Sequence, residues 1–377
     1  MSNRQPAAMP FIDLQAQRRR LAAAIDMAVQ RVLDHGQFIM GPEVAALEAK
    51  LAEFAGCKHC ITCANGTDAL ALAIRAKDIG PGDAVFIPSF TYVAAAEAAV
   101  WAGATPVLID VRPDTFNMDA ASLEAAIPAA IALGLKPRAV IPVDLFGQPA
   151  DYEAIATVAG RHGLLVIADG AQSFGATLHG KRVGRLAEIT TTSFFPAKPL
   201  GCYGDGGAIF TDDDELARLL RSLRTHGQGN HKYDHVRIGV NSRLDTLQAA
   251  FLIEKLTIFA DELVRRQEIA ERYRTGLGNL VTVPRLIPGA TSSWAQYTLV
   301  LEDRDRIAVA LKAAGIPTVV YYPIPAHRQA AYHSFPTAPG GAPVSERLAG
   351  EVLSLPMHAY LDTATQDRII EAVRAAL

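Results

Sequence analysis

The chain has 377 residues, which is too long for one ordinary hydrophobic core and favours two or three domains, or one large α/β domain with an appendage. Hydrophobic residues make up 50% of it and charged residues 20%, a balance that excludes a disordered or fibrous protein. Its 36 basic and 39 acidic residues nearly cancel, so no strong net field recruits nucleic acid or an anionic membrane, and a small molecule is the expected partner.

The N-terminal segment, Met1 to Pro6, lacks the apolar core of a signal peptide, and no later stretch reaches the roughly 20 apolar residues that span a bilayer. We therefore expect a cytoplasmic protein without a membrane partner. Four cysteines in this length argue against a disulfide framework. The spacing of Cys57, Cys60 and Cys63 would permit a zinc or iron–sulfur site, but no second cluster accompanies the distant Cys202. The segment instead predicts a short buried strand entering a glycine turn, and we expect no metal site.

Short β-rich runs alternate with helical stretches between about residue 60 and residue 212. This alternation is typical of a largely parallel sheet covered by helices. The predicted strands are Cys60 to Cys63, Ala84 to Pro88, Pro106 to Val111, Ala139 to Leu145, Leu164 to Asp169, Ile189 to Phe194 and Ala208 to Thr211. Thr211 can then cap a helix that has an acidic first turn, Asp212 to Glu215, and leucines along one face.

A long helical pattern from Asp245 to about Arg274 can carry the chain out of this sheet. The remainder predicts a small α+β unit with the strand Gln296 to Leu301, the helix Arg304 to Ala314, the strand Thr318 to Tyr322 and a closing helix from Thr365 to Leu377, while Pro336 to Pro343 reads as a surface loop. We therefore expect an α/β fold with a large domain at residues 1–250 and a small α+β C-terminal domain at residues 251–377.

The turn Asn65-Gly66-Thr67-Asp68 lies between the first predicted strand and a helix that begins near Thr67. Such a junction offers free backbone N–H groups and a positive helix end to an anion. Because capped glycine turns are common, this motif alone leaves a phosphate site and a purely structural turn both open.

Asp169 stands at the carboxyl end of an apolar run, where ligands of open α/β sheets gather. It either points into a site, where it would need a cationic or hydrogen-bonding partner, or it caps the next helix.

Lys198 lies between two prolines and among apolar residues, in Ser193 to Gly201, so its amine is poorly placed to reach water. Desolvation lowers the pKa of an amine, and a neutral amine can attack a carbonyl to form a Schiff base. The alternative is a surface lysine in a polar turn.

The anion site, the carboxylate and the amine together form one constellation that suits an aldehyde-bearing phosphorylated cofactor. In their order and spacing, from Phe11 to Leu14 at one end and from Ser354 to His358 at the other, the sequence resembles the sugar aminotransferases of the DegT/DnrJ/EryC1/StrS family. The resemblance implies a fold type I pyridoxal-phosphate-dependent transferase with a mostly parallel central sheet.

The resemblance also implies a role for each candidate in holding pyridoxal 5'-phosphate. Lys198 would be the Schiff-base lysine, Asp169 the partner of the pyridine nitrogen and Gln172 the contact to the ring hydroxyl. The residues that would hold the phosphate are Gly66, Thr67 and Ser193. Tyr92 would stack on the ring, the alternative being plain core packing.

Family members form homodimers with shared active sites. By this resemblance Asn241 would reach the cofactor phosphate of the neighbouring subunit, and Arg243 would bind a substrate carboxylate through its planar fork. A capping asparagine and a surface arginine remain the alternatives. Tyr321 and Tyr322 would contact the sugar, although close members often have histidine and tyrosine at these two positions.

The implied reaction is a ping-pong transamination in which L-glutamate gives its amino group, leaves as 2-oxoglutarate, and a nucleotide-linked keto sugar then receives the amino group. Family dehydratases carry histidine where this chain has Lys198, which favours transamination. A non-catalytic sensor of the cofactor or of a sugar nucleotide is the alternative from another class, but no DNA-binding segment is attached.

The segment from Ser193 to Ala208 looks most like members that act on UDP-2-acetamido-2-deoxy-3-keto-glucuronate, whose product enters polysaccharide biosynthesis such as that of the lipopolysaccharide O-antigen. A dTDP-linked 3-keto-6-deoxyhexose and a 4-keto nucleotide sugar remain alternative substrates.

Overall fold

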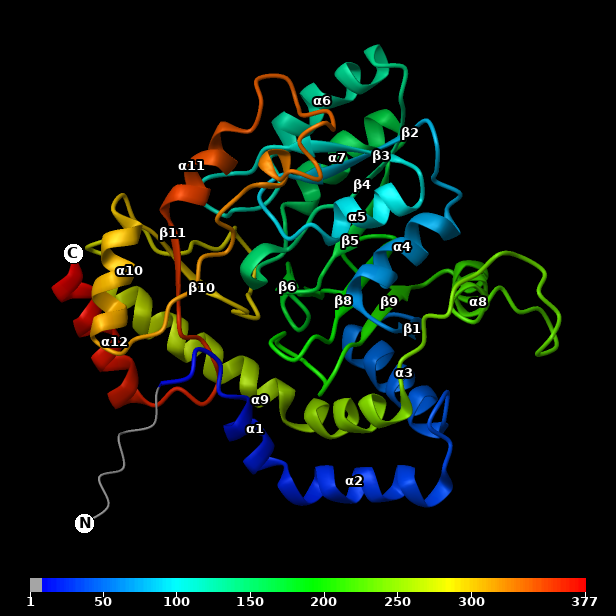
Figure 1. The fold of residues 1–377 in the computed structure, drawn as a ribbon, viewed down its shortest axis with the longest axis horizontal. Helices are drawn as coiled ribbons and strands as arrows, with labels where there is room; N and C mark the ends of the chain where they lie inside the picture. Colours follow the sequence, from blue (N-terminus) through cyan, green and yellow to red (C-terminus); the bar gives the residue numbers. More distant parts are fainter. Residues whose placement is uncertain (1–8) are drawn as a thin grey trace.

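A seven-stranded sheet forms the middle of the protein, of which a computed structural model describes residues 9–377 (Figure 1). Its strands are β1 (His59–Cys63), β2 (Asp83–Pro88), β3 (Thr105–Ile109), β4 (Lys136–Val140), β5 (Leu165–Asp169), β8 (Ile189–Ser193) and β9 (Gly207–Thr211). Their order is β1-β9-β8-β5-β4-β2-β3. Only β9 runs antiparallel to its two neighbours, and all other adjacent strands of this sheet are parallel. The predicted α/β fold with a mostly parallel central sheet is confirmed.

Both faces of this sheet are buried, because successive side chains of each strand pack into different hydrophobic clusters. In β2, Val85 and Ile87 pack with one cluster, whereas Ala84 and Phe86 pack with another. The first cluster lies under α4 (Gly66–Ala76), α5 (Ala94–Trp101) and α8 (Asp214–Leu223). On the other face, α6 (Ala120–Ala132) and α7 (Tyr152–His162) cover one half, and α3 (Pro42–Ala55) and α9 (Thr246–Leu277) cover the other.

The long helix α9 connects the sheet to the C-terminal unit (Figure 1). It packs against α3 and α2 (Ala22–His35) as well as against the last helix, α12 (Thr363–Ala376). The C-terminal unit also contains β10 (Tyr297–Val300), α10 (Arg304–Ala313), α11 (Pro343–Glu351) and β11 (Val352–Leu355), with β10 and β11 antiparallel. Because α9 contacts elements on both sides, the domain boundary at residue 250 stays a prediction.

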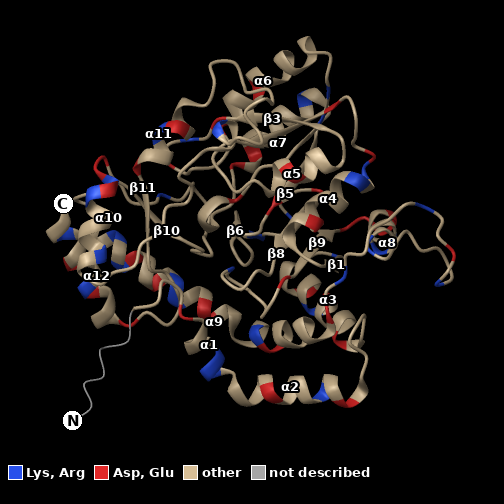
Figure 2. Ribbon diagram, in the orientation of Figure 1, with Lys and Arg blue, Asp and Glu red and all other residues tan. Residues whose placement is uncertain are grey.

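The remaining elements are short: α1 (Leu14–Arg20), the hairpin β6 (Thr177–Leu178) and β7 (Lys181–Arg182), and the 3₁₀ turns η1 (Leu145–Gly147) and η2 (Ala326–Arg328). Figure 2 shows acidic and basic residues interspersed over the outer helices. Within residues 9–377, no helix combines the length and the apolar character needed to cross a membrane.

The predicted cap of the helix α8 is wrong. The cap of α8 is Asp213, whose side chain accepts from the backbone N–H groups of Glu215 and Leu216, whereas the Thr211 hydroxyl accepts from the N–H of Asp213. The Asp213 carboxylate reaches the N–H groups of the first helical turn, whereas the Thr211 hydroxyl reaches only the N–H of Asp213 itself.

The strand predicted from Ala139 to Leu145 ends at Val140, because Pro142 has no N–H to continue the ladder and the apolar residues after it form a buried loop. The strand predicted from Thr318 to Tyr322 is also wrong. It is reduced to a single bridge between Val319 and Ser354, since the tyrosines after it turn away to line a cavity.

Candidate active site

A cavity of about 780 Å³ opens at the carboxyl ends of the parallel strands. Such a volume suits a cofactor together with a small substrate. The sequence-predicted site residues that line it are Gly66, Thr67, Tyr92, Asp169, Gln172, Ser193, Lys198, Tyr321 and Tyr322. Residues from the large sheet and from the C-terminal unit therefore meet in one place.

One wall of the cavity is the first turn of α4, which follows β1. Asn65 caps this helix, its side-chain oxygen accepting from the N–H of Asp68 at 2.8 Å. A Cβ atom at Gly66 would lie 2.7 Å from the Cβ of Ser193, so only glycine lets the helix start so close to β8. Free N–H groups of the first turn and the Ser193 hydroxyl thus come together as a cradle for an anion.

Asp169 lies at the end of β5 with only 7% of its surface exposed. Its carboxylate accepts from the N–H of Ala171 at 3.0 Å, and the segment after it is a turn rather than the helix of the alternative interpretation. Burial raises the pKa of Asp169, and the positive charge of Lys198 partly offsets this effect. A buried carboxylate of this kind is poised to pair with a cation in the cavity.

Lys198 faces Asp169 across the same cavity. Burial of its amine lowers the pKa of Lys198, while the carboxylate of Asp169 acts in the opposite direction. Because the pKa of Lys198 is lowered, a larger fraction of its amine is neutral and nucleophilic at neutral pH.

Gln172 and two tyrosines form the opposite wall. The Gln172 side chain accepts from the N–H of Phe146 at 2.7 Å and donates to the Tyr322 hydroxyl at 3.3 Å, which fixes its orientation. The rings of Tyr92 and Tyr322 lie 6.3 Å apart between centroids, and Tyr321 packs edge-on against Tyr322. Tyr92 from the large sheet unit and Tyr322 from the C-terminal unit thus lie side by side in the cavity wall.

A buried link holds these two units together beside the tyrosines. Ser89 follows β2, and its carbonyl accepts from the N–H of Ala326 at 2.7 Å. Its hydroxyl lies 2.6 Å from Nδ1 of His327, whose Nε2 lies 2.9 Å from the carboxylate of Glu346 on α11. The segment that carries Tyr322 is therefore tied to the loop that carries Tyr92.

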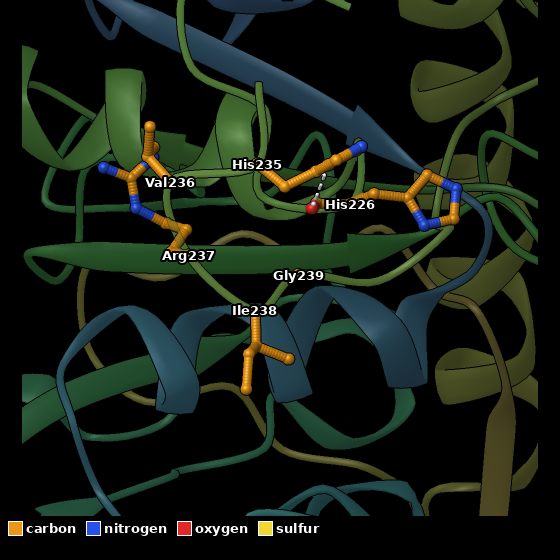
Figure 3. A pocket seen from close by; sticks show the side chains of 6 residues that line it. All are labelled: His226, His235, Val236, Arg237, Ile238 and Gly239. Carbon is orange, nitrogen blue, oxygen red and sulfur yellow. Dashed lines mark hydrogen bonds between the residues drawn. The ribbon is translucent and has the colours of Figure 1, made fainter. Parts of the chain in front are cut away.

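Asn241 and Arg243 do not line this cavity. Asn241 is exposed and forms an isolated β-bridge with Thr225, and Arg243 is half-buried. Both follow a loop whose side chains are shown in Figure 3, where His235 lies 3.0 Å from the carbonyl oxygen of His226. Within the described residues, neither of the two lines the cavity with the other candidates, although Ser242 between them accepts from the N–H of Ala64 at 3.1 Å.

Several residues that line the cavity carry no sequence motif of their own. Trp101 at the end of α5 and Phe195 before Lys198 are 63% and 52% exposed, which is unusual for large aromatic side chains. Gln296 also lines the cavity, at the start of the strand β10. Their only sequence signal is proximity to a predicted motif or strand.

The cysteines are part of the hydrophobic core rather than of a metal site. Cys60 and Cys63 are buried in the hydrophobic clusters on opposite faces of the sheet, so their sulfur atoms do not converge. Burial raises the pKa of Cys63 to about 12 and that of Cys57 to about 11, which makes both thiols poor nucleophiles and poor metal ligands.

An anion cradle, a buried carboxylate and an amine of lowered pKa, gathered at one edge of a parallel sheet, define a pyridoxal-phosphate-dependent enzyme. The glycine cradle and the carboxylate fit the phosphate and the ring nitrogen of that cofactor. Residues 19–374 match the model of the DegT/DnrJ/EryC1/StrS aminotransferase family. The chain belongs to this aminotransferase family, which depends on pyridoxal phosphate.

Individual relatives are similar over nearly their whole length. The chain is 50% identical to a UDP-2-acetamido-2-deoxy-3-oxo-D-glucuronate aminotransferase of Pseudomonas aeruginosa, over 97% of this chain and 99% of the relative. It is 42% identical to a protein of Geobacillus stearothermophilus named pleiotropic regulatory protein, over 97% of each. A crystal structure of a DegT DnrJ EryC1 StrS aminotransferase from Brucella abortus superposes with a TM-score of 0.96 at 53% identity, covering 97% of this chain and 99% of that one.

Proposed function

We propose that the chain transfers the amino group of L-glutamate to UDP-2-acetamido-2-deoxy-3-keto-glucuronate, forming the 3-amino sugar and 2-oxoglutarate. The observation that carries the chemistry is that the Lys198 amine and the buried Asp169 carboxylate line one cavity, where each shifts the pKa of the other. The 50% identity to an enzyme named for this sugar supports the choice of substrate.

In this proposal the cavity residues divide the work of holding the cofactor. Gly66, Thr67 and Ser193 bind its phosphate, and Asp169 keeps its ring nitrogen protonated. Bound pyridoxal phosphate supplies an electron sink for charge that develops on the α-carbon of the donor.

The remaining contacts of the proposal orient the ring and carry out the proton transfer. The hydrogen bond from Phe146 fixes Gln172, which then meets the ring hydroxyl, and Tyr92 covers one ring face. Lys198 Nζ takes the proton from the α-carbon of the donor, because its lowered pKa leaves a fraction of it neutral.

A homodimer with shared active sites is part of the same proposal. The loop before Asn241 exposes apolar side chains, with Ile238 80% and Tyr233 85% exposed, and such residues are favoured at interfaces. Asn241 and Arg243 then complete the neighbouring cavity, Asn241 at the phosphate and Arg243 at the sugar carboxylate, next to Tyr321 and Tyr322. The cytoplasmic location and a role in O-antigen synthesis stay predictions.

Mixing two inactive variants tests the shared site. Lys198→Ala and Asn241→Ala homodimers are each expected to have little activity, whereas a subunit mixture regains about a quarter of the wild-type activity, because half of the dimers are mixed and each mixed dimer has one intact site. Activity after mixing and unfolding–refolding is the measurement. No recovery, with mixed dimers shown to form, would place Asn241 in the cavity of its own chain.

The substrate carboxylate gives a prediction for Arg243. Arg243→Lys is expected to raise KM for the glucuronate substrate about tenfold, since the bidentate contact is lost, and to leave the glutamate half-reaction unchanged. Arg237→Lys on the same loop is the matched control, because Arg237 already donates to Ser222 within its own chain. Equal effects of Arg243→Lys on both half-reactions would rule out the carboxylate role.

A panel of nucleotide sugars tests the function as a whole. The purified protein is supplied with L-glutamate and with UDP-2-acetamido-2-deoxy-3-keto-glucuronate, a dTDP-linked 3-keto-6-deoxyhexose or a 4-keto nucleotide sugar, and the amino sugar is detected by mass spectrometry. We expect the highest kcat/KM with the glucuronate. Preference for another sugar overturns the proposed substrate, and binding without turnover of any sugar favours the alternative of a non-catalytic sensor.

A further inference from the structure

A second, much smaller cavity is also lined by Lys198 and by the two prolines beside it. Its volume is about 20 Å³, and its walls come from four segments that are distant in sequence: Ile12 to Gln17, Pro196 to Pro199, α9, and His358 to Tyr360. Lys198 lines both cavities, so the segment that carries it is the wall between them. We call the smaller cavity the rear chamber.

Two buried charges of α9 face the rear chamber. Glu262 and Arg266 are 3% and 6% exposed and lie one helical turn apart. The Glu262 carboxylate accepts from the Gln17 amide at 3.0 Å and from the Tyr360 hydroxyl at 2.5 Å. One guanidinium nitrogen of Arg266 donates to the carbonyl of Trp294 at 2.8 Å. These bonds hold the chamber wall in place and compensate part of the cost of burying the charges.

His358 completes the chamber and is only 5% exposed. Neither of its ring nitrogens, nor Nε of Arg266, has a hydrogen-bond partner among the described residues. Burial, together with the charge of Arg266, lowers the pKa of His358 to about 4, whereas Asp13 and Asp362 act in the opposite direction. At neutral pH the ring is therefore neutral, with one nitrogen that donates and one that accepts.

The dimensions of the chamber match one small polar molecule. A cavity needs roughly 10–15 Å³ to hold a water, and a buried water needs two to four polar partners. The rear chamber offers about 20 Å³ together with the His358 ring and the Nε of Arg266. A buried polar group without a partner destabilises the fold, and a water that bonds to it removes this cost.

We propose that the rear chamber binds one water molecule between His358 and Arg266, and that His358 acts as a positioning residue for Lys198. The segment from Pro196 to Pro199 has two residues without an N–H, and its local backbone bond runs from the N–H of Lys198 to Phe195 at 2.8 Å. The water and the polar residues of the rear chamber therefore determine the position of the Lys198 backbone. The backbone position in turn determines where the Lys198 amine lies in the active-site cavity. The proposal rests on the proposed function only for the role of Lys198.

Residues of two motifs from opposite ends of the chain line the rear chamber. The motif from Phe11 to Leu14 contributes Ile12, Asp13 and Leu14 to one wall, and the motif from Ser354 to His358 contributes the histidine. No residue of either motif lines the active-site cavity, although the Phe11 ring packs against Tyr321. Both motifs instead line the rear chamber, next to Lys198.

Two variants of His358 separate positioning from simple packing. His358→Gln keeps one donor and one acceptor, whereas His358→Phe fills the space without either. We expect His358→Phe to slow the uptake of pyridoxal phosphate by the unloaded protein and to lower kcat, each about tenfold, with KM for both substrates within about twofold. His358→Gln should stay within about threefold of wild type, and His333→Gln on the surface should match wild type in every measurement.

The water is tested directly in a crystal structure of the full chain with its cofactor, at a resolution where ordered waters are visible. One water within about 3 Å of a ring nitrogen of His358 and of Arg266 supports the proposal, and a chamber without one overturns it. Equal losses in His358→Gln and His358→Phe, or a His358→Phe protein that takes up the cofactor at the wild-type rate, overturn the positioning role. If His358→Phe does not fold, the crystal structure and His358→Gln decide. Cofactor uptake and the water are measured without any sugar, so they remain informative if the proposed substrate is wrong.

Discussion

Replacing Lys198 by alanine is expected to abolish the cofactor absorbance near about 410 nm and to lower transamination by at least about 10⁴-fold. The reason is that Lys198 alone among the described lysines lines the active-site cavity, where its amine has a lowered pKa and faces the carboxylate of Asp169. The spectrum is recorded on the purified protein with and without L-glutamate. In wild type the band should move towards about 330 nm when glutamate is added, and in the variant glutamate should not produce this shift, because the lysine that moves the proton is missing.

A second buried lysine provides the matched control. Burial lowers the pKa of Lys255 to about 8, but its amine donates to the carbonyl of Gly201 at 2.6 Å and does not line the active-site cavity. Lys255→Met is expected to lower the unfolding temperature and to keep both the band and its response to glutamate. If Lys255→Met lost the band while Lys198→Ala kept it, the assignment of the cofactor lysine would be overturned.

The central sheet was predictable because its signals are local. Each strand is a short apolar run between turn residues, and the parallel arrangement follows from the helices between the runs. The helices of the first 55 residues were not predicted, since α2 and α3 depend on packing against α9, about two hundred residues away. The same limit explains the strand wrongly predicted from Thr318 to Tyr322. Its tyrosines have strand propensity, but contacts at the cavity determine their conformation.

The residues of the active site also divide into those that local sequence signals predict and those that only tertiary packing brings to the cavity. Gly66 and Asp169 were predictable because each follows or ends a strand of one sheet, and the ends of its parallel strands meet at one edge, whereas Ser193 was implied only by the family resemblance. Trp101 was not, because only the packing of α5 brings it to the cavity. The rear chamber lies beyond sequence reasoning altogether, since the bond between Gln17 and Glu262 joins residues 245 positions apart.

The second large effect is expected for Asp169→Asn, which should lower activity without lowering the stability of the fold. Asp169→Asn keeps the shape of the side chain and an oxygen that can accept from Ala171, but it removes the charge that would pair with a protonated ring nitrogen. A charge-assisted hydrogen bond is worth about 1.5–3 kcal/mol, so we expect kcat to fall about 10- to 100-fold.

Stability should not follow, because burial raises the pKa of Asp169 and its ionised form is therefore disfavoured in the folded protein. A carboxyl whose pKa is raised on folding stabilises the fold below its unfolded pKa, and this contribution is lost as pH rises through the folded pKa. At neutral pH the unloaded Asp169→Asn protein is thus expected to unfold within about 1 kcal/mol of wild type, or to be more stable. Thermal unfolding of both unloaded proteins, with kcat measured beside it, checks the separation. A parallel loss of stability and activity would mean that Asp169 holds the fold of the β5 turn rather than the charge of the cofactor.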